Sequence, residues 1–201
     1  MNEKRILKFF PLPIFQYKLD NHKEHNQNLS KYIYELYEVD KKGLARSNQG
    51  GWHSKPFDLK DKEKAPFKFF TDIQKYVADV FKEYGWHYAP GKVNLTEMWA
   101  IINKKNNFNL EHTHPNNYLS AAYYVKAPQN CGSFRVSNPN QIARERIPLS
   151  DKKTELNMNI AQIQPVEGDL LLFPAYLPHS VGINLSDEDR IVISFNIDIL
   201  R

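Results

Sequence analysis

The sequence has 201 residues and a single cysteine, Cys131, so an internal disulfide framework is excluded. It has no apolar run of about 18 residues, the length that crosses a membrane, and no apolar targeting segment at its start. From these absences we expect a soluble, cytoplasmic protein with no membrane partner. Cys131 lies in a turn-like PQNCG segment without a neighbouring histidine, and we expect no nucleophilic role for it.

Dense charge of one sign is also missing. The formal net charge is only +4, and the lysines occur as scattered pairs, which indicates a solvated surface and no nucleic-acid partner. Neither an internal repeat nor a low-complexity tract is visible, and an aromatic content of 13% excludes a disordered chain. The length suits one well-filled core, so we expect a single domain over residues 1–201.

Residues 1–92 are predicted to form a strand and helices that support the jelly-roll core of residues 93–201. The segment Ile6–Leu19 is apolar and aromatic but is interrupted by Pro11 and Pro13, which favours an edge strand. The polar segment Lys41–Lys64 is predicted to be a loop with at most a short turn.

Two segments in this part have apolar residues at helical spacing. The first, Asn28–Val39, has Asn28 or Ser30 as a plausible N-cap. The second, Ala65–Tyr84, is followed by Gly85 as a stop signal. We expect both helices to pack against the rest of the protein.

Residues 93–201 change to short extended runs separated by turn signals. The predicted strands are Val93–Asn103, Asn109–His114, Tyr118–Lys126, Gly132–Val136, Ile160–Gln164, Asp169–Phe173, His179–Ile183 and Arg190–Ile199. Eight such strands indicate a mainly β protein, a double-stranded β-helix of the cupin-like jelly-roll type flanked by the two helices. Ser137–Asn159 would be an insert at the barrel mouth, and Arg135, Arg144 and Arg146 in or near it slightly favour an acidic substrate.

Two histidines share one face of the predicted strand Asn109–His114. Because side chains alternate along a strand, His112 and His114 point the same way and Glu111 points the other way. The turn residues Asn116 and Asn117 predict that this strand forms a hairpin with Tyr118–Lys126. His179 follows a proline-containing bend that can bring it to the same mouth, and three such imidazoles can hold Fe, Cu, Ni or Zn.

The last strand has one polar and one apolar face. Arg190, Val192, Ser194 and Asn196 alternate with Ile191, Ile193, Phe195 and Ile197. If the helices cover the apolar face, the other face lines the barrel interior, where a buried guanidinium requires an anion, and its fork of donors matches a carboxylate. Tyr118, Ser120 and Tyr124 share a face of their strand, as do Trp99, Ile101 and Asn103 of theirs.

The order of these blocks resembles that of a known family. His-x-His, Leu-Ser-x-x-Tyr-Tyr-Val, Gly-Asp-Leu-Leu-Leu-Phe-Pro, His179 and Arg190-x-x-x-Ser194 follow one another between Trp99 and Ile197. This order is similar to that of the 2-oxoglutarate and iron(II)-dependent oxygenases, in particular the prolyl-hydroxylase-like branch and a group found in bacteria and phages. Several blocks in the same order make the resemblance fairly specific, whereas one block alone is weak.

The resemblance implies a role for each matching residue. His112 and His179 match iron ligands, and His114 stands where most relatives have an aspartate. Arg190 matches the residue that binds the far carboxylate of 2-oxoglutarate, with Ser194 and Tyr124 as helpers and Asn103 as a contact near the metal-chelating end. The implied cofactors are Fe(II), 2-oxoglutarate and O2, and the implied reaction couples decarboxylation of 2-oxoglutarate to succinate with hydroxylation of a substrate C–H bond.

Other interpretations stay open on the sequence alone. The protein could be a three-histidine dioxygenase without 2-oxoglutarate, or a jelly-roll module without catalysis. His114 could orient a water or the cosubstrate without binding the metal itself, and Arg190 could form an ion pair with one of the acids at 187–189. Of Tyr118, Tyr123 and Tyr124, we expect one in the site and the others in the core. We expect no ligand role for the remaining histidines, which are His22, His25, His53 and His87.

Overall fold

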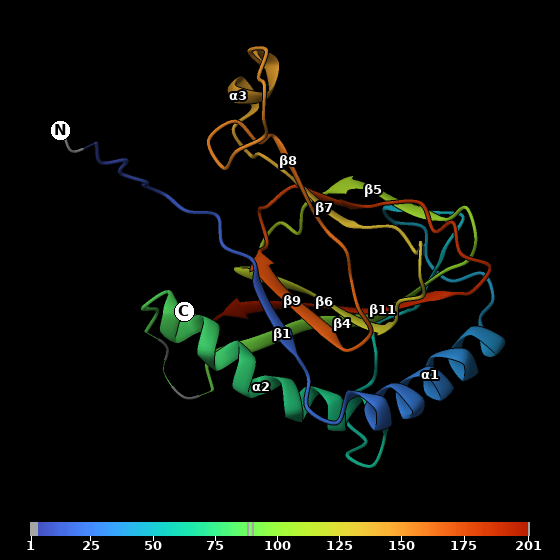
Figure 1. The fold of residues 1–201 in the computed structure, drawn as a ribbon. Coiled ribbons are helices and arrows are strands. Elements are labelled where there is room, and N and C mark those ends of the chain that lie inside the picture. The colour runs from blue at the N-terminus through green and yellow to red at the C-terminus, as the bar shows by residue number, and fades with distance from the viewer. Residues whose placement is uncertain (1–3, 88, 90, 201) are drawn as a thin grey trace.

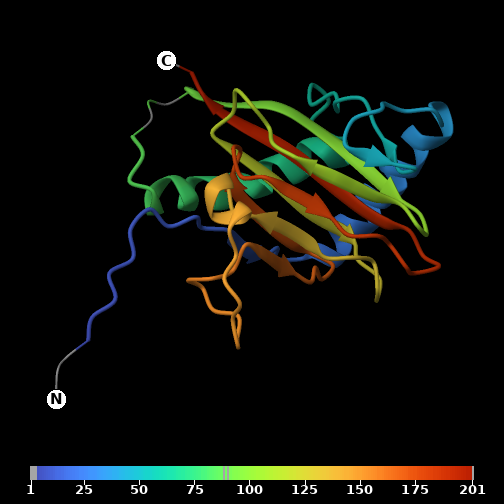
Figure 2. The same ribbon diagram turned by 90° about the horizontal axis from the view of Figure 1, so that it is seen from above.

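Two antiparallel β-sheets packed face to face form the body of the protein in a computed structural model, which describes residues 4–87, 89 and 91–200. The six-stranded sheet has the order β1-β9-β6-β11-β4-β3, and the five-stranded sheet has the order β2-β5-β10-β7-β8. Their strands are β1 (Phe15–Lys18), β2 (Asn48–Gln49), β3 (Trp52–His53), β4 (Val93–Asn103), β5 (Phe108–His112), β6 (Leu119–Lys126), β7 (Phe134–Ser137), β8 (Ile160–Ile163), β9 (Asp169–Pro174), β10 (His179–Val181) and β11 (Arg190–Ile199). The predicted jelly roll is confirmed, and Figures 1 and 2 show one sheet lying over the other.

The six-stranded sheet is organised around β11, which pairs with β4 on one side and β6 on the other. Ile191, Ile193, Phe195 and Ile197 point into the larger core, as their alternation predicts. Val192, on the opposite face, belongs to a smaller core between the two sheets. The polar face of β11 therefore lines the interior of the jelly roll.

Two helices, α1 (His22–Val39) and α2 (Ala65–Glu83), cover the outer face of this sheet (Figure 1). The buried side chains of α2 recur at helical spacing, and Gly85 follows the helix with a φ of 64°. The helix predicted for Ala65–Tyr84 is thus confirmed. The predicted start of the first helix is wrong, because α1 begins at His22 and Asn28 and Ser30 lie inside it. The added turns contain the buried Asn26, which accepts a hydrogen bond from the Tyr123 hydroxyl, so contact with β6 extends the helix.

The structure overturns two further predictions about connections. The strands β5 and β6 do not form a hairpin, because the turn at Asn116 carries the chain from one sheet to the other. Instead β5 pairs with β2 and β10, as befits a jelly roll in which the chain crosses repeatedly from one sheet to the other. The segment Lys41–Lys64 also supplies β2 to one sheet and β3 to the other, and strands of two residues are too short to show a period in the sequence.

The parts outside the two sheets project from the body. Residues 4–14 extend away, and β1 lies at the sheet edge as predicted (Figure 1). The insert between β7 and β8 contains the short helix α3 (Gln141–Glu145), and Arg144 fastens it to Glu111 of β5 through an ion pair of 3.1 Å. Within the described ranges, no helix has the length and apolarity that a membrane span needs.

Candidate metal centre and anion pocket

A cavity of about 680 Å³ lies between the two sheets. Its wall includes all seven residues that the sequence singled out, which are His112, His114, His179, Asn103, Tyr124, Arg190 and Ser194. The three basic residues suggested for an acidic substrate, Arg135, Arg144 and Arg146, are not part of this wall. These three arginines therefore give no support from the cavity to an acidic substrate, although Arg46 is part of its wall.

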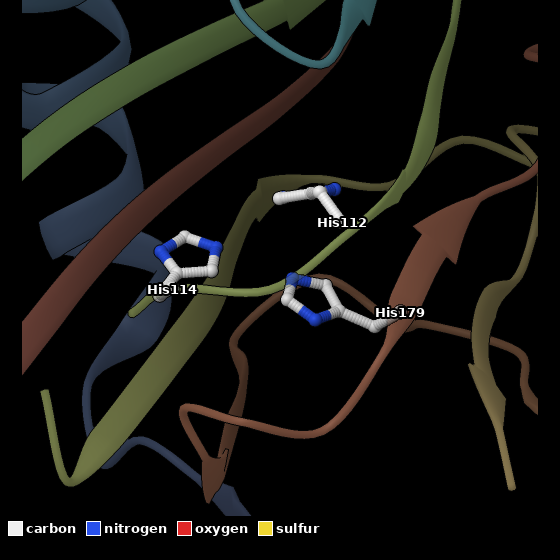
Figure 3. A group of neighbouring side chains, drawn as sticks. All are labelled: His112, His114 and His179. Atoms are coloured by element: carbon white, nitrogen blue, oxygen red, sulfur yellow. The ribbon is translucent and has the colours of Figure 1, made fainter. Parts of the chain in front are cut away.

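Three histidines of the cavity wall lie close to one another (Figure 3). Each offers one ring nitrogen, and these atoms all lie within 4.8 Å of one another. His112 and His179 are cross-strand partners on β5 and β10. His114 lies beyond the end of β5, where its backbone N–H donates to the Ala175 carbonyl at 2.9 Å. Glu111, on the other strand face, instead accepts hydrogen bonds from Ser137 and Arg144.

Each of the three rings also forms a hydrogen bond with a neighbouring group. Nδ1 of His112 lies 2.7 Å from the Leu110 carbonyl, and Nδ1 of His179 lies 2.8 Å from the Leu177 carbonyl. Because a carbonyl only accepts, both Nδ1 atoms carry the proton and both Nε2 atoms are unprotonated; that of His112 has the Ser47 hydroxyl 3.4 Å away. His114 is hydrogen-bonded to the Asn196 side chain, which also accepts from the Ser120 hydroxyl. Such partners behind the ring fix the orientation of metal-binding histidines.

Burial keeps these imidazoles neutral. Desolvation lowers the pKa of His179 to about 3 and that of His114 to about 4, with smaller contributions from the neighbouring histidines. The pKa of His112 is also lowered by burial. Because a metal binds only the unprotonated ring, all three residues are ready to ligate at neutral pH. The cluster fits a divalent transition metal, with histidine in the place of the usual carboxylate.

Arg190 is part of the cavity wall and is 1% exposed. Its Nη1 donates to the carbonyls of Gly182, at 3.0 Å, and Cys131. Its Nη2 is buried and has no hydrogen-bond partner among the described residues. Burial lowers the pKa of the guanidinium, which nonetheless stays charged because an arginine in a protein is not deprotonated. A buried charge with a free donor indicates a place for an anion.

The acids that could have neutralised Arg190 are engaged elsewhere. Asp187 pairs with Lys105 at 2.6 Å, and Glu188 pairs with Lys126 at 2.8 Å. Asp189 accepts from the Tyr34 hydroxyl at 2.8 Å. The alternative of a structural ion pair for Arg190 is therefore wrong.

The resemblance implied that Ser194 lies beside Arg190 and that Asn103 lies near the metal. The strand register places Asn103 beside Arg190 and Ser194 farther along the strand. Asn103 is the register partner of Arg190, and Ser194 lies opposite Trp99, whose ring stacks on His114 at 5.7 Å. Ser194 lies four positions after Arg190 on the strand, about 13 Å away at the usual rise per residue. The sequence pattern did not show this because it contained no cross-strand register. Asn103 thus lies at the anion end, and Ser194 lies level with His114.

The three tyrosines have different surroundings. Tyr124 is fully buried in the cavity wall, and burial and Arg190 shift its pKa in opposite directions, with the larger effect of burial raising it. Tyr123 belongs to the core beneath the helices. Tyr118 is 42% exposed and packs against Trp86. One tyrosine of the three lines the cavity, as expected.

Sequence reasoning missed several polar residues of the wall, among them Ser47, His53 and Asn109. His53 is buried and stacks on Trp99 at 5.5 Å, while its Nδ1 donates to the Ser54 carbonyl, so it lies in the wall but outside the ligand cluster. Asn109 precedes the His-x-His motif on β5, and strict period two would place it on the face of Glu111. The register shift between β5 and β10 accompanies its position in the cavity wall, and no signal in the sequence predicts that shift. Ser47 and His53 lie in the segment predicted to be a loop. His22, His25 and His87 lie outside the cavity, as expected.

Residues 97–196 match the model of a protein family described as "Putative 2OG-Fe(II) oxygenase". This core belongs to the 2OG-Fe(II) oxygenases. The matched segment contains all seven site residues predicted above. The resemblance seen in the sequence is thus confirmed.

Solved structures of other 2OG oxygenases share this fold. A Pseudomonas putida prolyl-4-hydroxylase aligns with a TM-score of 0.66 at 14% identity over 94% of both chains. HygX from Streptomyces hygroscopicus, with nickel and 2-oxoglutarate bound, gives 0.64 at 15% identity over 94% of this chain and 83% of its own. The viral collagen prolyl hydroxylase of Paramecium Bursaria Chlorella virus-1, as its 2OG complex, gives 0.57 at 14% identity over 90% and 94%. None of the curated proteins matches this oxygenase core.

Proposed function

We propose that the protein is a non-haem Fe(II) and 2-oxoglutarate-dependent oxygenase that hydroxylates a C–H bond of its substrate. The observation that carries this proposal is the presence, in one cavity, of a three-histidine cluster and a buried arginine with an unpaired donor. Family membership and the 2-oxoglutarate complexes of HygX and the viral hydroxylase support it.

His112, His114 and His179 would hold the iron. The Nε2 atoms of His112 and His179 are the ring nitrogens that can bind the metal, and Asn196 orients the ring of His114. Three neutral ligands leave the formal charge of Fe(II) at +2, whereas the more usual carboxylate lowers it by one. When bound, iron and 2-oxoglutarate supply the oxidising power, since decarboxylation of the keto acid to succinate drives the reaction of O2 with a C–H bond.

The protein's part is to bind and orient the keto acid. The guanidinium of Arg190 would bind the far carboxylate, with Tyr124 and Asn103 beside it. Phe134, Phe173 and Val192 form the apolar core next to this site and exclude water from it. Ser194 lies level with His114 and would contact either the substrate or the end of 2-oxoglutarate that is nearest the metal.

The rival functions account less well for Arg190. In a three-histidine dioxygenase without 2-oxoglutarate, the substrate alone chelates the metal and a buried cation has no anion to bind. A jelly-roll module without catalysis likewise provides no anion for the unpaired Nη2 of Arg190. We propose further that the chain works as one domain in the cytoplasm without a nucleic-acid partner, which the lone buried Cys131 and scattered lysines support.

Anaerobic addition of Fe(II) and then 2-oxoglutarate tests the proposal. We expect a weak visible metal-to-ligand absorption band and, after admission of O2, formation of succinate. A protein that binds iron but gives neither the band nor succinate is not a 2-oxoglutarate oxygenase.

A further inference from the structure

The inner face of β4 continues past the level of the histidine cluster. Asn103 and Glu97 both line the cavity from this strand. Asn103 is the register partner of Arg190, and Glu97, six positions earlier, is the partner of Asn196, which is hydrogen-bonded to His114. Six positions span about 20 Å at the usual rise per residue. A molecule of 2-oxoglutarate held by Arg190 is much shorter than this distance, so the Glu97 end of the cavity is left for another molecule.

Glu97 lies beside an irregularity in β4. The register of β4 with β11 shifts after Asn196, so that Thr96 has no partner on β11, and such bulges re-aim side chains beside active sites. Thr96 and Glu97 are consecutive, yet both are exposed and both line the cavity. The Thr96 hydroxyl donates to Asn117 Oδ1 at 2.7 Å, which ties this part of β4 to the turn between β5 and β6. The Glu97 carboxylate has no hydrogen bond or ion pair with a described residue, so it is free to bind a ligand.

A cation lines the same cavity from the segment before β2. Arg46 is exposed, and its guanidinium likewise has no hydrogen bond or ion pair with any residue that the structure describes. Its backbone is held in place, because its N–H donates to Asn48 Oδ1 at 2.7 Å and the Asn48 amide donates to the Leu44 carbonyl at 3.2 Å. The carbonyl of the next residue, Ser47, accepts from the Leu110 N–H at 2.9 Å. Arg46 is therefore presented to the cavity from a fixed backbone.

His53 links the two opposite charges. It is the register partner of Ile101 on β4, shares the cavity wall with that residue and is 8% exposed. Its Nδ1 donates to the Ser54 carbonyl at 2.7 Å, so its Nε2 is an acceptor, and it has no partner in the described part of the chain. Burial lowers the pKa of His53, and Arg46 lowers it further whereas Glu97 raises it. Because both charges act on this one ring, a small molecule at this end of the cavity can contact both.

We propose that Glu97, His53 and Arg46 form the binding site for the substrate, and that this substrate is a free amino acid. The inference rests on the proposed function and names the substrate class of the same cavity. The Glu97 carboxylate and Nε2 of His53 would accept from the α-ammonium group, and the Arg46 guanidinium would bind the α-carboxylate. The side chain of the amino acid would extend toward the histidine cluster, where one of its C–H bonds is hydroxylated. One atom of O2 enters this bond and the other enters succinate, as CO2 leaves 2-oxoglutarate.

The two charges argue against the other classes of substrate. A residue inside a peptide has neither an ammonium nor a carboxylate group on its backbone, so it would leave Glu97 and Arg46 unpaired. A nucleotide has an anion for Arg46 but no cation for Glu97, and an amino sugar has the reverse. A free amino acid carries both charges on one carbon atom, a separation that suits two groups placed around one ring.

Binding of amino acids to the protein loaded with Zn(II) and 2-oxoglutarate tests the assignment without turnover, because zinc replaces iron without redox chemistry. The probe is a mixture of the free proteinogenic amino acids, and saturation-transfer NMR shows which of them bind. We expect those that bind to lose about tenfold in affinity when the amino group is acetylated or the carboxylate is converted to an amide. Each change removes a hydrogen bond to a charged group.

Two neutral variants assign the contacts. In Glu97→Gln, acetylation of the amino group should lose most of its effect, whereas amidation of the carboxylate should keep it. Arg46→Gln should show the opposite pattern. An unfolded variant loses both effects together, so the reciprocal pattern reports the two contacts and not the fold. Glu35→Gln neutralises an exposed acid on α1, outside the cavity, and is the matched control that should bind as the natural protein does.

The possible outcomes separate this inference from the proposed function. With Fe(II) in place of zinc, the amino acid that binds should increase succinate formation and gain one oxygen atom, as mass spectrometry detects. If no free amino acid binds, or if the blocked forms bind as well as the free ones, the amino-acid site is wrong, and equal binding points to a peptide. Failure of the natural protein to bind zinc or 2-oxoglutarate overturns the proposed function instead.

Discussion

His112 and His179 are register partners on the antiparallel strands β5 and β10, and their ring centroids lie 4.3 Å apart. Their placement is therefore fixed by main-chain hydrogen bonds between two strands. His114 is positioned differently, by a turn that crosses to the other sheet and by its hydrogen bond with Asn196. Two of the three proposed ligands are thus parts of the sheet, and the third depends on side-chain contacts.

Replacement of His179 by Gln should remove metal binding but preserve the fold. Glutamine fills similar space against Phe134 and Phe173 but lacks the imidazole nitrogen. Loss of a partner behind a ligand already costs about 10- to 100-fold in metal affinity, so loss of the ligand should cost more than about 100-fold. Zinc calorimetry measures the affinity, and thermal unfolding checks the fold. The exposed His87, replaced by Gln, is the matched control and should bind zinc normally; unchanged zinc affinity in His179→Gln contradicts the assigned site.

Replacement of Arg190 by Met should weaken dicarboxylate binding and leave zinc binding intact. Methionine keeps much of the buried volume but removes the charge, and loss of one member of a buried charge pair costs about 2–5 kcal/mol. The apparent Michaelis constant for 2-oxoglutarate and the dissociation constant for glutarate both report this loss. Lys105→Met, which removes an exposed cation paired with Asp187, is the control. Unchanged constants in Arg190→Met mean that the keto acid binds elsewhere.

The sequence predicted those features that depend on local alternation. The ranges of β4 and β11 are confirmed at both ends, and the alternation of polar and apolar side chains is clear along β11. The grouping of Arg190 with the inner face followed from the same alternation. Cross-strand register is set by the whole sheet, and this is why Asn103 and Ser194 were expected at the wrong ends of the cavity.

The wall residues from β2 and β3 could not be predicted in this way. Ser47 and His53 reach the cavity only because two-residue strands pair with β5 and β4. Those pairings are long-range, and the local composition around Gly50 and Gly51 is typical of a loop. The same holds for α1, whose first turns depend on contact between Asn26 and Tyr123.

The stability of the metal-free protein should fall on acidification from about pH 6.5 to pH 4. The ordinary pKa of histidine is about 6.5, and unfolded chains take up protons there. In the folded protein burial holds the pKa of His114 at about 4 and that of His179 at about 3. Between these values the unfolded state binds more protons, so the free energy of unfolding decreases as the pH falls. Urea unfolding at both ends of this window measures the decrease.

The variant His179→Gln provides the control for that decrease. It removes one titrating ring, and the loss of stability across the same pH window should be smaller than in the natural protein. Any contribution from other groups is common to both proteins and cancels in the comparison. Equal losses mean that His179 is protonated in the folded state as readily as in the unfolded chain.

Substitution of His114 distinguishes a ligand from a residue behind the ligands. If His114 binds the metal, His114→Ala should lose most iron, because only His112 and His179 remain. His114→Asp should keep iron, since an aspartate at this position completes the set of two histidines and one carboxylate used by non-haem oxygenases. The carboxylate also lowers the formal charge of the site by one, so activity should be retained or raised. Elemental analysis of iron after desalting measures occupancy independently of turnover. Near-stoichiometric iron in His114→Ala contradicts the three-histidine site and leaves His112 and His179 as its protein ligands, with His114 orienting the cosubstrate or a water beside them.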